Sequence, residues 1–310
     1  MLTEGDIRII RVFEVVTKLL HAGASVHGVE AGFKSVGHLT NGQHCLSCVE
    51  FIRARLINGY TTEQILEHVV YQLKISRQVA NFIVGLVERL LLPVDSPLFD
   101  FIRNHEHRYI YKPFHFLEIY ERHLAGFRNK EVSLMEFGVF HGGSLQMWKH
   151  YLGEHAKIYG VDIDPRCTVA SEERIRVITA DQGDVRALRV IKRFLPTFDI
   201  IVDDGGHYMH QQINTFEEMF PHLNDGGIYL IEDIGTSYWK SCGGGYRNPG
   251  SFIEYSKHLV DQIHARHSDE LSADKYTDSI FAMHYYDGVL VIEKRSVAPP
   301  IEMKFGSLSF

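Results

Sequence analysis

The stretch FDIIVDDGGHYMHQQ, residues 198–212, decides the fold class of this chain. Its apolar, β-branched first part is typical of a buried strand, and the glycines at 205 and 206 allow the chain to turn sharply. Two adjacent acids, Asp203 and Asp204, close the strand, and a histidine follows the turn. Because the burial of charge is costly, acids at this place need compensation, which indicates a functional site at the end of the strand.

Four further β-rich runs resemble this one. They span residues 132–138, 157–163, 174–180 and 227–233, and neighbouring runs are separated by lengths suited to a helix. This rhythm predicts an α/β fold with a doubly wound, Rossmann-like parallel sheet. A last pair, residues 280–286 and 289–295, is joined by Asp287 and Gly288, the strongest short signal for a tight hairpin. We therefore expect five parallel strands and a C-terminal antiparallel hairpin.

Residues 1–95 have a different pattern, with apolar residues spaced three and four apart, as in amphipathic helices. The segment LPVDSPLFD, residues 92–100, is typical of a linker. The sequence thus predicts a helical auxiliary domain over residues 1–95 and an α/β domain over residues 96–310. Apolar helix faces in the first domain suggest a homo-oligomer, a dimer or a tetramer. Cys45 and Cys48 lack a second pair at zinc-ligand spacing, so we interpret them as small apolar residues of a helix.

The composition narrows the class of partner. The chain has 310 residues, 45% of them hydrophobic, and a formal net charge of −7 without a long Lys/Arg cluster. This balance argues against a nucleic-acid partner and favours a small molecule. The N-terminus lacks the basic and apolar parts of a signal peptide, and no apolar run of about 18 residues offers a membrane span. With only four scattered cysteines, we expect a cytoplasmic protein.

Ligands of such sheets bind at the carboxyl ends of the strands. The first run ends in EFGVFHGGS, whose glycines let a ligand approach the backbone, although the spacing of Gly138 and Gly142 is not the dinucleotide pattern. The second run ends in Asp162, where an acid commonly binds ribose hydroxyls, and Asp181 and Gln182 after the third could meet an adenine edge. Together they predict a pocket for an adenosine without pyrophosphate, hence S-adenosylmethionine. The alternatives are an ordinary tight turn and an acid that caps a helix.

The fourth and fifth runs end in pairs of acids, Asp203-Asp204 and Glu232-Asp233. Four uncompensated carboxylates on neighbouring strand ends would repel one another, and a hard divalent cation such as Mg²⁺ or Ca²⁺ would neutralise them. Because successive strand residues point to opposite faces, not all four are ligands. We predict that Asp204, Glu232 and Asp233 bind Mg²⁺, with Asp203 behind them or beside the cofactor. The alternative is that these acids are solvated helix caps.

Three further features surround these acids. His207 follows Asp204 by three residues and has a side chain suited to a general base at neutral pH, unless it is one ordinary surface histidine among 19. Residues 235–252 place Tyr238 and Trp239 before three glycines, which suits a lid over a substrate or an ordinary connection. Residues 105–120, rich in histidine and tyrosine, predict either a wall of the acceptor pocket or a packed amphipathic helix.

The segments EFGVFHGGS, GVDIDP, ADQGD, DIIVDDGGH and FPHLNDGGIYLIEDIGTSYW together resemble the metal-dependent sugar O-methyltransferases that tailor glycosylated antibiotics. That group includes the enzymes for mycinamicin VI, macrocin and demethyldecarbamoylnovobiocin. The resemblance extends from Phe101 to the C-terminus and implies a class I S-adenosylmethionine-dependent methyltransferase domain over residues 96–310. It implies that Glu136, Gly138, Asp162, Asp181 and Gln182 hold S-adenosylmethionine, that Asp204, Glu232 and Asp233 bind Mg²⁺, and that His207 is the general base. We add Ser144 and Asp203 to the cofactor site, and Tyr238 and Trp239 to the acceptor site.

The implied reaction is an in-line transfer of a methyl group to a sugar hydroxyl of a glycosylated small molecule. A catechol also presents neighbouring oxygens to a metal, so a catechol O-methyltransferase is one alternative. An Fe(II) hydroxylase is another, although non-haem oxygenases bind iron through two histidines and a carboxylate, and one histidine lies close to these acids in the sequence. A third alternative is a cofactor-binding protein without turnover.

Overall fold

A computed structural model describes residues 96–105 and 107–307, together with seven earlier residues (65–67, 70, 77, 80 and 84), all of them helical. The chain divides into two compact units, Met1–Glu106 and His107–Phe310, and each is described by itself. Most of the helical pattern predicted for residues 1–95, including Cys45 and Cys48, lies outside the described residues.

Helix α6 (Pro97–Asn104) belongs to the first unit. Ser96 caps it by accepting a hydrogen bond from the backbone N–H of Phe99 (3.4 Å), and Pro97 takes the first helical position, where its missing N–H is tolerated. The prediction of a linker over residues 92–100 is therefore wrong for residues 97–100, because the Ser-Pro pair starts a helix there.

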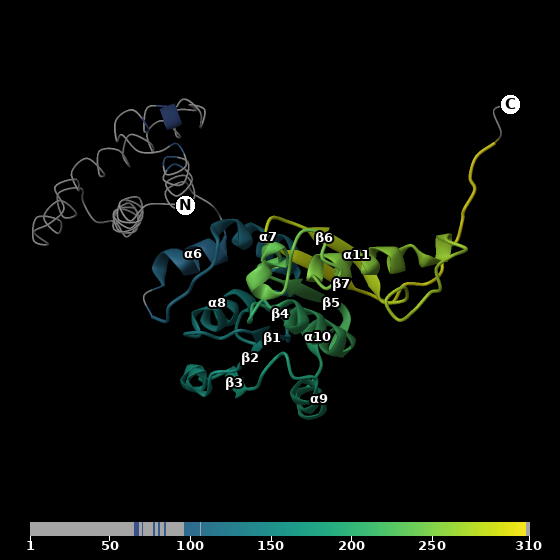
Figure 1. The fold of residues 1–310 in the computed structure, drawn as a ribbon. Coiled ribbons are helices and arrows are strands. Elements are labelled where there is room, and N and C mark those ends of the chain that lie inside the picture. The colour runs from purple at the N-terminus through teal and green to yellow at the C-terminus, as the bar shows by residue number, and fades with distance from the viewer. Residues whose placement is uncertain are drawn as a thin grey trace, which may run out of the picture. The chain divides into compact units, whose positions relative to one another are not determined.

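The second unit contains a seven-stranded sheet in the order β3-β2-β1-β4-β5-β7-β6 (Figure 1). The first five strands are parallel, and β7 pairs antiparallel with both β5 and β6. Their bounds are β1 Ser133–Phe137, β2 Lys157–Asp162, β3 Ile175–Thr179, β4 Phe198–Asp203, β5 Leu223–Ile231, β6 Ile280–Tyr285 and β7 Leu290–Lys294. The predicted fold class is confirmed, and β5 begins before the predicted run at residue 227.

Helices cover both faces of this sheet (Figure 1). They are α7 (Phe114–Leu124), α8 (Gly143–Leu152), α9 (Val185–Phe194), α10 (Met209–Met219) and α11 (Phe252–Ile263), with short 3₁₀ helices η1 to η6 (Ala125–Phe127, Pro165–Ala170, Phe220–His222, Ile234–Tyr238, Lys240–Cys242 and Ala265–His267). One hydrophobic cluster joins α9, α10 and α11 to the strand side chains of one face, among them Met135 and Phe137. Glu136 points the other way and accepts a hydrogen bond from Ser144 of α8. The face of the sheet opposite the hydrophobic cluster thus carries the polar side chains of Glu136 and Ser144.

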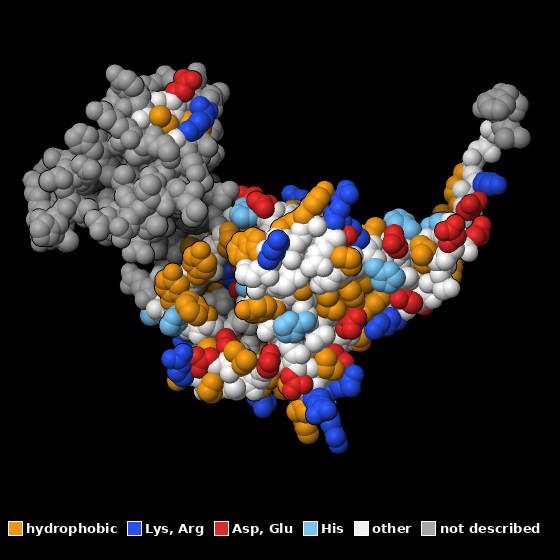
Figure 2. Space-filling view, viewed as in Figure 1, with side chains coloured by type: hydrophobic (Ala, Val, Ile, Leu, Met, Phe, Trp, Pro, Cys, Tyr) orange, Lys and Arg blue, Asp and Glu red, His pale blue; other side chains and the backbone are white. Residues whose placement is uncertain are grey.

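The predicted hairpin and the surface complete the second unit. Gly288, with a φ of 78°, lies in the tight turn that connects β6 to β7, as the Asp287-Gly288 pair predicts. Residues 298–307 extend away from the sheet (Figure 1). On the face shown in Figure 2, acidic and basic side chains of the described residues are interspersed. Within the described ranges, no helix is long and apolar enough to cross a membrane.

Candidate active site

A cavity of about 1150 Å³ lies at the carboxyl ends of β1 to β5, where the sequence predicts the ligand site. Ten of the thirteen predicted site residues line it, namely Gly138, Ser144, Asp162, Asp181, Gln182, Asp204, His207, Glu232, Asp233 and Trp239. The other three lie outside its lining: Glu136 and Asp203 are fully buried, and Tyr238 is exposed. The strand ends thus converge as the parallel sheet requires.

Asp162 holds the glycine-rich turn after β1 against the end of β2. Its Oδ2 accepts hydrogen bonds from the backbone N–H groups of Val139 (2.8 Å) and Phe140 (3.1 Å), and its Oδ1 accepts one from that of Asp164 (2.9 Å). A carboxylate has roughly four acceptor sites, so capacity remains for a ligand hydroxyl. Behind the turn, the N-terminus of α8 presents backbone N–H groups suited to an anionic group.

Gly138 lets this turn pack directly on the end of β4. Its φ is 90°, and a Cβ atom would lie 2.0 Å from the carbonyl oxygen of Asp204. The left-handed backbone and the close approach are separate reasons for glycine here. The contact fixes where Asp204 emerges into the cavity.

We expect Gly138→Ala to lower the free energy of unfolding by about 2–6 kcal/mol, because backbone strain and overpacking each cost about 1–3 kcal/mol. Gly226→Ala is the matched control: its φ is 79°, but nothing lies within 4 Å of a Cβ atom there. Gly226→Ala should lower the free energy of unfolding only by the cost of backbone strain, about 1–3 kcal/mol. Urea denaturation measures both, and equal losses for the two variants would contradict the close packing of Gly138 on Asp204.

Gln182 faces the protein interior. Its Nε2 donates to Asp203 Oδ1 (2.8 Å), and its Oε1 accepts from the backbone N–H of Gly206 (3.0 Å). Burial raises the pKa of Asp203 to about 6, against the hydrogen bond from Gln182. The Oδ2 atom of Asp203 is buried without a partner among the described residues. Gln182 therefore orders the Gly205-Gly206 turn through its amide, and it also lines the cavity.

The sequence analysis missed Lys112, which lies at the centre of the acids. Its Nζ donates to Asp204 Oδ2 (2.6 Å) and to both carboxylate oxygens of Glu232 (2.8 Å each), and it lies 3.4 Å from Glu136 Oε1. Its side chain is only 4% exposed. Burial by itself lowers the pKa of Lys112, but the surrounding carboxylates raise it well above its usual value, so the ammonium stays charged. A lone lysine within an aromatic segment was the available sequence signal.

Glu232 has a second donor in Tyr120 of α7. The Tyr120 hydroxyl donates to Glu232 Oε1 (2.7 Å), and both residues are buried. Burial and the nearby charge of Asp204 raise the pKa of Glu232 to about 8, while Lys112 and Tyr120 oppose the rise. The acids are thus incompletely neutralised by the protein's own groups.

Lys112→Met should destabilise the protein by about 3–5 kcal/mol, because removing one partner leaves buried carboxylates uncompensated. Lys149→Met is the control: Lys149 pairs with Glu172 (2.9 Å) at side-chain exposures of 21% and 27%, where the loss should be below about 1 kcal/mol. Denaturant unfolding compares the two. Similar small losses would show that Lys112 is not an internal counter-ion.

His207 sits beside the acids in a left-handed backbone conformation, with a φ of 56°. Its Nε2 lies 3.5 Å from Asp233 Oδ2 and 3.8 Å from Asp204 Oδ1, and its Nδ1 is buried without a partner among the described residues. Asp233 and Phe140 are also left-handed, with a φ of 51° each, and all three residues line the cavity. Such backbone strain concentrates at functional sites.

The acids form two groups that share Asp204. Asp204, His207 and Asp233 bring ligand atoms within 4.8 Å of one another, and so do Glu136, Asp204 and Glu232. When all four carboxylates are ionised, the single ammonium of Lys112 leaves an excess of three formal negative charges, and a divalent cation would offset two of them. The donors are mainly hard oxygens, which Mg²⁺ and Ca²⁺ prefer. This donor set fits a hard divalent cation.

Two further segments contribute residues to the lining of the cavity. Trp239, 60% exposed, lines it between η4 and η5, whereas Tyr238 does not. Within residues 105–120, predicted as a wall of the acceptor pocket or a packed amphipathic helix, residues 109–113 line the cavity and α7 begins at Phe114.

The strand order and the hairpin give the Rossmann-like sheet that the sequence predicts, with the acids at the ends of its parallel strands. Residues 135–234 match a family model described as a methyltransferase domain. The match covers most of β1 and all of β2 to β5, but not the lining residues 109–113, 235, 236, 239 and 288.

Relatives of this chain include sugar O-methyltransferases of antibiotic tailoring, which confirms the resemblance seen in the sequence. The mycinamicin VI 2''-O-methyltransferase of Micromonospora griseorubida is 38% identical over 190 residues, which cover 56% of this chain and 47% of that protein. The 8-demethyl-8-α-L-rhamnosyl tetracenomycin-C 2'-O-methyltransferase of Streptomyces olivaceus is 34% identical over 190 residues, 57% of this chain and 49% of that protein.

A solved structure of a methyltransferase is also similar to this chain. The methyltransferase MycE of the mycinamycin biosynthetic pathway, in complex with Mg, SAH and mycinamycin VI, superposes with a TM-score of 0.58 at 30% identity, over 76% of this chain and 62% of that one. The chain spans about half the length of the curated relatives it matches.

Proposed function

We propose that this chain is a Mg²⁺-dependent O-methyltransferase that moves a methyl group from S-adenosylmethionine to a sugar hydroxyl of a glycosylated small molecule. The observation that carries the proposal is the meeting of Asp204, His207 and Asp233 at the cavity wall, with ligand atoms within 4.8 Å of one another. A base beside carboxylate oxygens that suit a hard cation is the constellation that hydroxyl methylation needs. Relatives that methylate sugar hydroxyls support this reading.

The cavity suits S-adenosylmethionine together with an acceptor. At about 1150 Å³ it exceeds the roughly 300–1,000 Å³ usual for one small-molecule ligand. Asp162 retains acceptor capacity for a ribose hydroxyl, and the N-terminus of α8 suits the methionine carboxylate. Ser144, Asp181 and the buried Glu136 would complete the cofactor side.

Asp204, Glu232 and Asp233 would hold the magnesium ion, and Lys112 and Tyr120 orient Glu232 beside them. When bound, the ion lowers the pKa of the acceptor hydroxyl and fixes its position. His207 accepts the hydroxyl proton at Nε2, the ring nitrogen that faces Asp233. Trp239, and Tyr238 beside it, would cover the acceptor. The helical domain predicted for residues 1–95 would support a cytoplasmic homo-oligomer.

The test is a methylation assay with S-adenosylmethionine and three acceptors: mycinamicin VI, 8-demethyl-8-α-L-rhamnosyl tetracenomycin C and a catechol, each with MgCl₂ or with EDTA. We expect methylation of a glycosylated acceptor that EDTA abolishes. Faster methylation of the catechol would favour a catechol O-methyltransferase. Calorimetric binding of S-adenosylhomocysteine with no methylation of any acceptor would favour a protein without turnover.

A further inference from the structure

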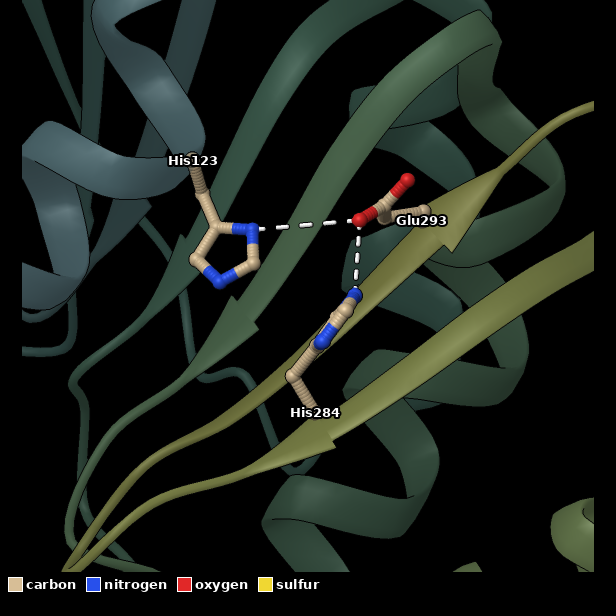
Figure 3. Close-up of side chains that lie close together, drawn as sticks. All are labelled: His123, His284 and Glu293. Carbon is tan, nitrogen blue, oxygen red and sulfur yellow. Dashed lines mark hydrogen bonds and ion pairs between the residues drawn. The ribbon is translucent and has the colours of Figure 1, made fainter.

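His123, His284 and Glu293 form a second cluster of metal-ligating side chains, and none of them lines the cavity. His123 comes from α7, His284 from β6 and Glu293 from β7. Figure 3 shows the three side chains pointing toward one another from the helix and the two strands. Their candidate ligand atoms all lie within 4.8 Å of one another. The fold thus joins residues far apart in the sequence into one compact group.

The hairpin register places His284 and Glu293 on the same face. Glu293 pairs with Ala282, so His284, two residues further along β6, is its diagonal neighbour. Glu293 Oε1 lies 2.7 Å from His284 Nε2 and 3.9 Å from His123 Nδ1 (Figure 3). A single carboxylate oxygen therefore faces two imidazole nitrogens.

The remaining nitrogen of His123 has a partner of the kind that orients metal ligands. His123 Nε2 lies 2.8 Å from the hydroxyl oxygen of Tyr286. When Nε2–H donates to that oxygen, Nδ1 presents its lone pair to the cluster.

We propose that His123, His284 and Glu293 bind a divalent transition-metal ion, Zn²⁺ in the first place, with water completing the coordination. Two imidazoles and one carboxylate are an established ligand combination for Zn²⁺. The side chains of His284 and Glu293 are 37% and 31% exposed, which gives an ion and a water access, while that of His123 is 6% exposed. Mg²⁺ prefers oxygen ligands, so this site and the acids of the cavity select different ions.

The ion would link α7 to the β6–β7 hairpin, because its ligands come from both. α7 also carries Tyr120, whose hydroxyl donates to Glu232 among the acids of the cavity. Metal binding to the folded state alone stabilises it by mass action. Zn²⁺ should therefore raise the melting temperature by fixing the helix that supports the cavity.

The competing arrangement contains no metal. Tyr286 would donate its hydroxyl proton to His123 Nε2, and His123 Nδ1–H would face Glu293, giving a hydrogen-bonded network of the same atoms. The two arrangements differ in whether removing one imidazole changes metal affinity.

The test is a titration of the 310-residue chain, stripped of metal, with Co²⁺ as the spectroscopic probe and Zn²⁺ as the competitor. All proteins carry Asp204→Asn, which removes a carboxylate from the acids of the cavity. We expect one Co²⁺ with visible ligand-field absorption, displaced by Zn²⁺. Losing a group that only orients a ligand costs about 10- to 100-fold in affinity, so Tyr286→Phe should weaken binding about 10-fold and His284→Ala at least about 100-fold. His258→Ala, at an exposed histidine of α11, should change nothing.

Unchanged Co²⁺ affinity in His284→Ala, or no absorption in any protein, would establish the metal-free network instead. Glu293→Gln, at a partly exposed site, gives a second variant that removes a ligand from the proposed metal site. Circular dichroism checks that each protein is folded. Cofactor and acceptor are absent throughout, so this proposal can fail while the proposed methyl transfer stands.

Discussion

Asp204→Asn is expected to lower kcat/KM for methyl transfer by about 10³-fold or more. Asp204 belongs to both groups of acids, so its loss would remove a proposed cation ligand from each. A cation that polarises the reacting oxygen contributes several kcal/mol to the transition state, and each 1.36 kcal/mol is about tenfold in rate. The rate is measured with the acceptor that the wild-type protein methylates, under saturating MgCl₂.

Asp184→Asn is the matched control for this substitution. Asp184 caps α9 by accepting a hydrogen bond from the backbone N–H of Arg186 (2.8 Å), and it does not line the cavity. Asparagine caps helices equally well, so both stability and rate should remain near wild type. A wild-type rate in Asp204→Asn would exclude this acid as a ligand.

His207→Asn should lower kcat by about 10²- to 10⁴-fold, the usual contribution of a general base. Asparagine is chosen because it tolerates the left-handed backbone at residue 207, where φ is 56°. The affinity for S-adenosylhomocysteine, measured by calorimetry, should change little, since Nε2 faces the acids of the acceptor side.

His210→Asn provides the comparison, because His210 is an exposed histidine close to His207 in the sequence. It should keep wild-type kcat. A loss of cofactor affinity in His207→Asn as large as its loss of kcat would assign His207 to cofactor binding rather than to proton transfer.

The periodicity of the sequence predicted the sheet correctly. Each β-branched run became a strand, and Asp287-Gly288 became the turn of the hairpin, because these signals act between neighbours in the chain. The error at residues 97–100 came from a proline, which starts a helix as readily as it interrupts one.

The meeting of the acids could also be predicted, since parallel strands bring their carboxyl ends to one edge of the sheet. The side chains that bond to these acids could not be predicted. Lys112 lies 92 residues from Asp204 and 120 from Glu232, and nothing in its local pattern indicates that it will meet them. The inward orientation of Gln182, toward Asp203 and Gly206, likewise depends on tertiary packing.

The most direct measurement of the central claim is a Mn²⁺ titration followed by electron paramagnetic resonance, without cofactor or acceptor. Both proteins carry His284→Ala, so that the second proposed site does not contribute. We predict one bound Mn²⁺ in the parent protein and at least about 100-fold weaker binding after Asp204→Asn, since loss of a ligand should exceed the roughly 10- to 100-fold cost of losing an orienting partner. Equal Mn²⁺ affinity in the two proteins would contradict a divalent cation held by the acids at the ends of β4 and β5.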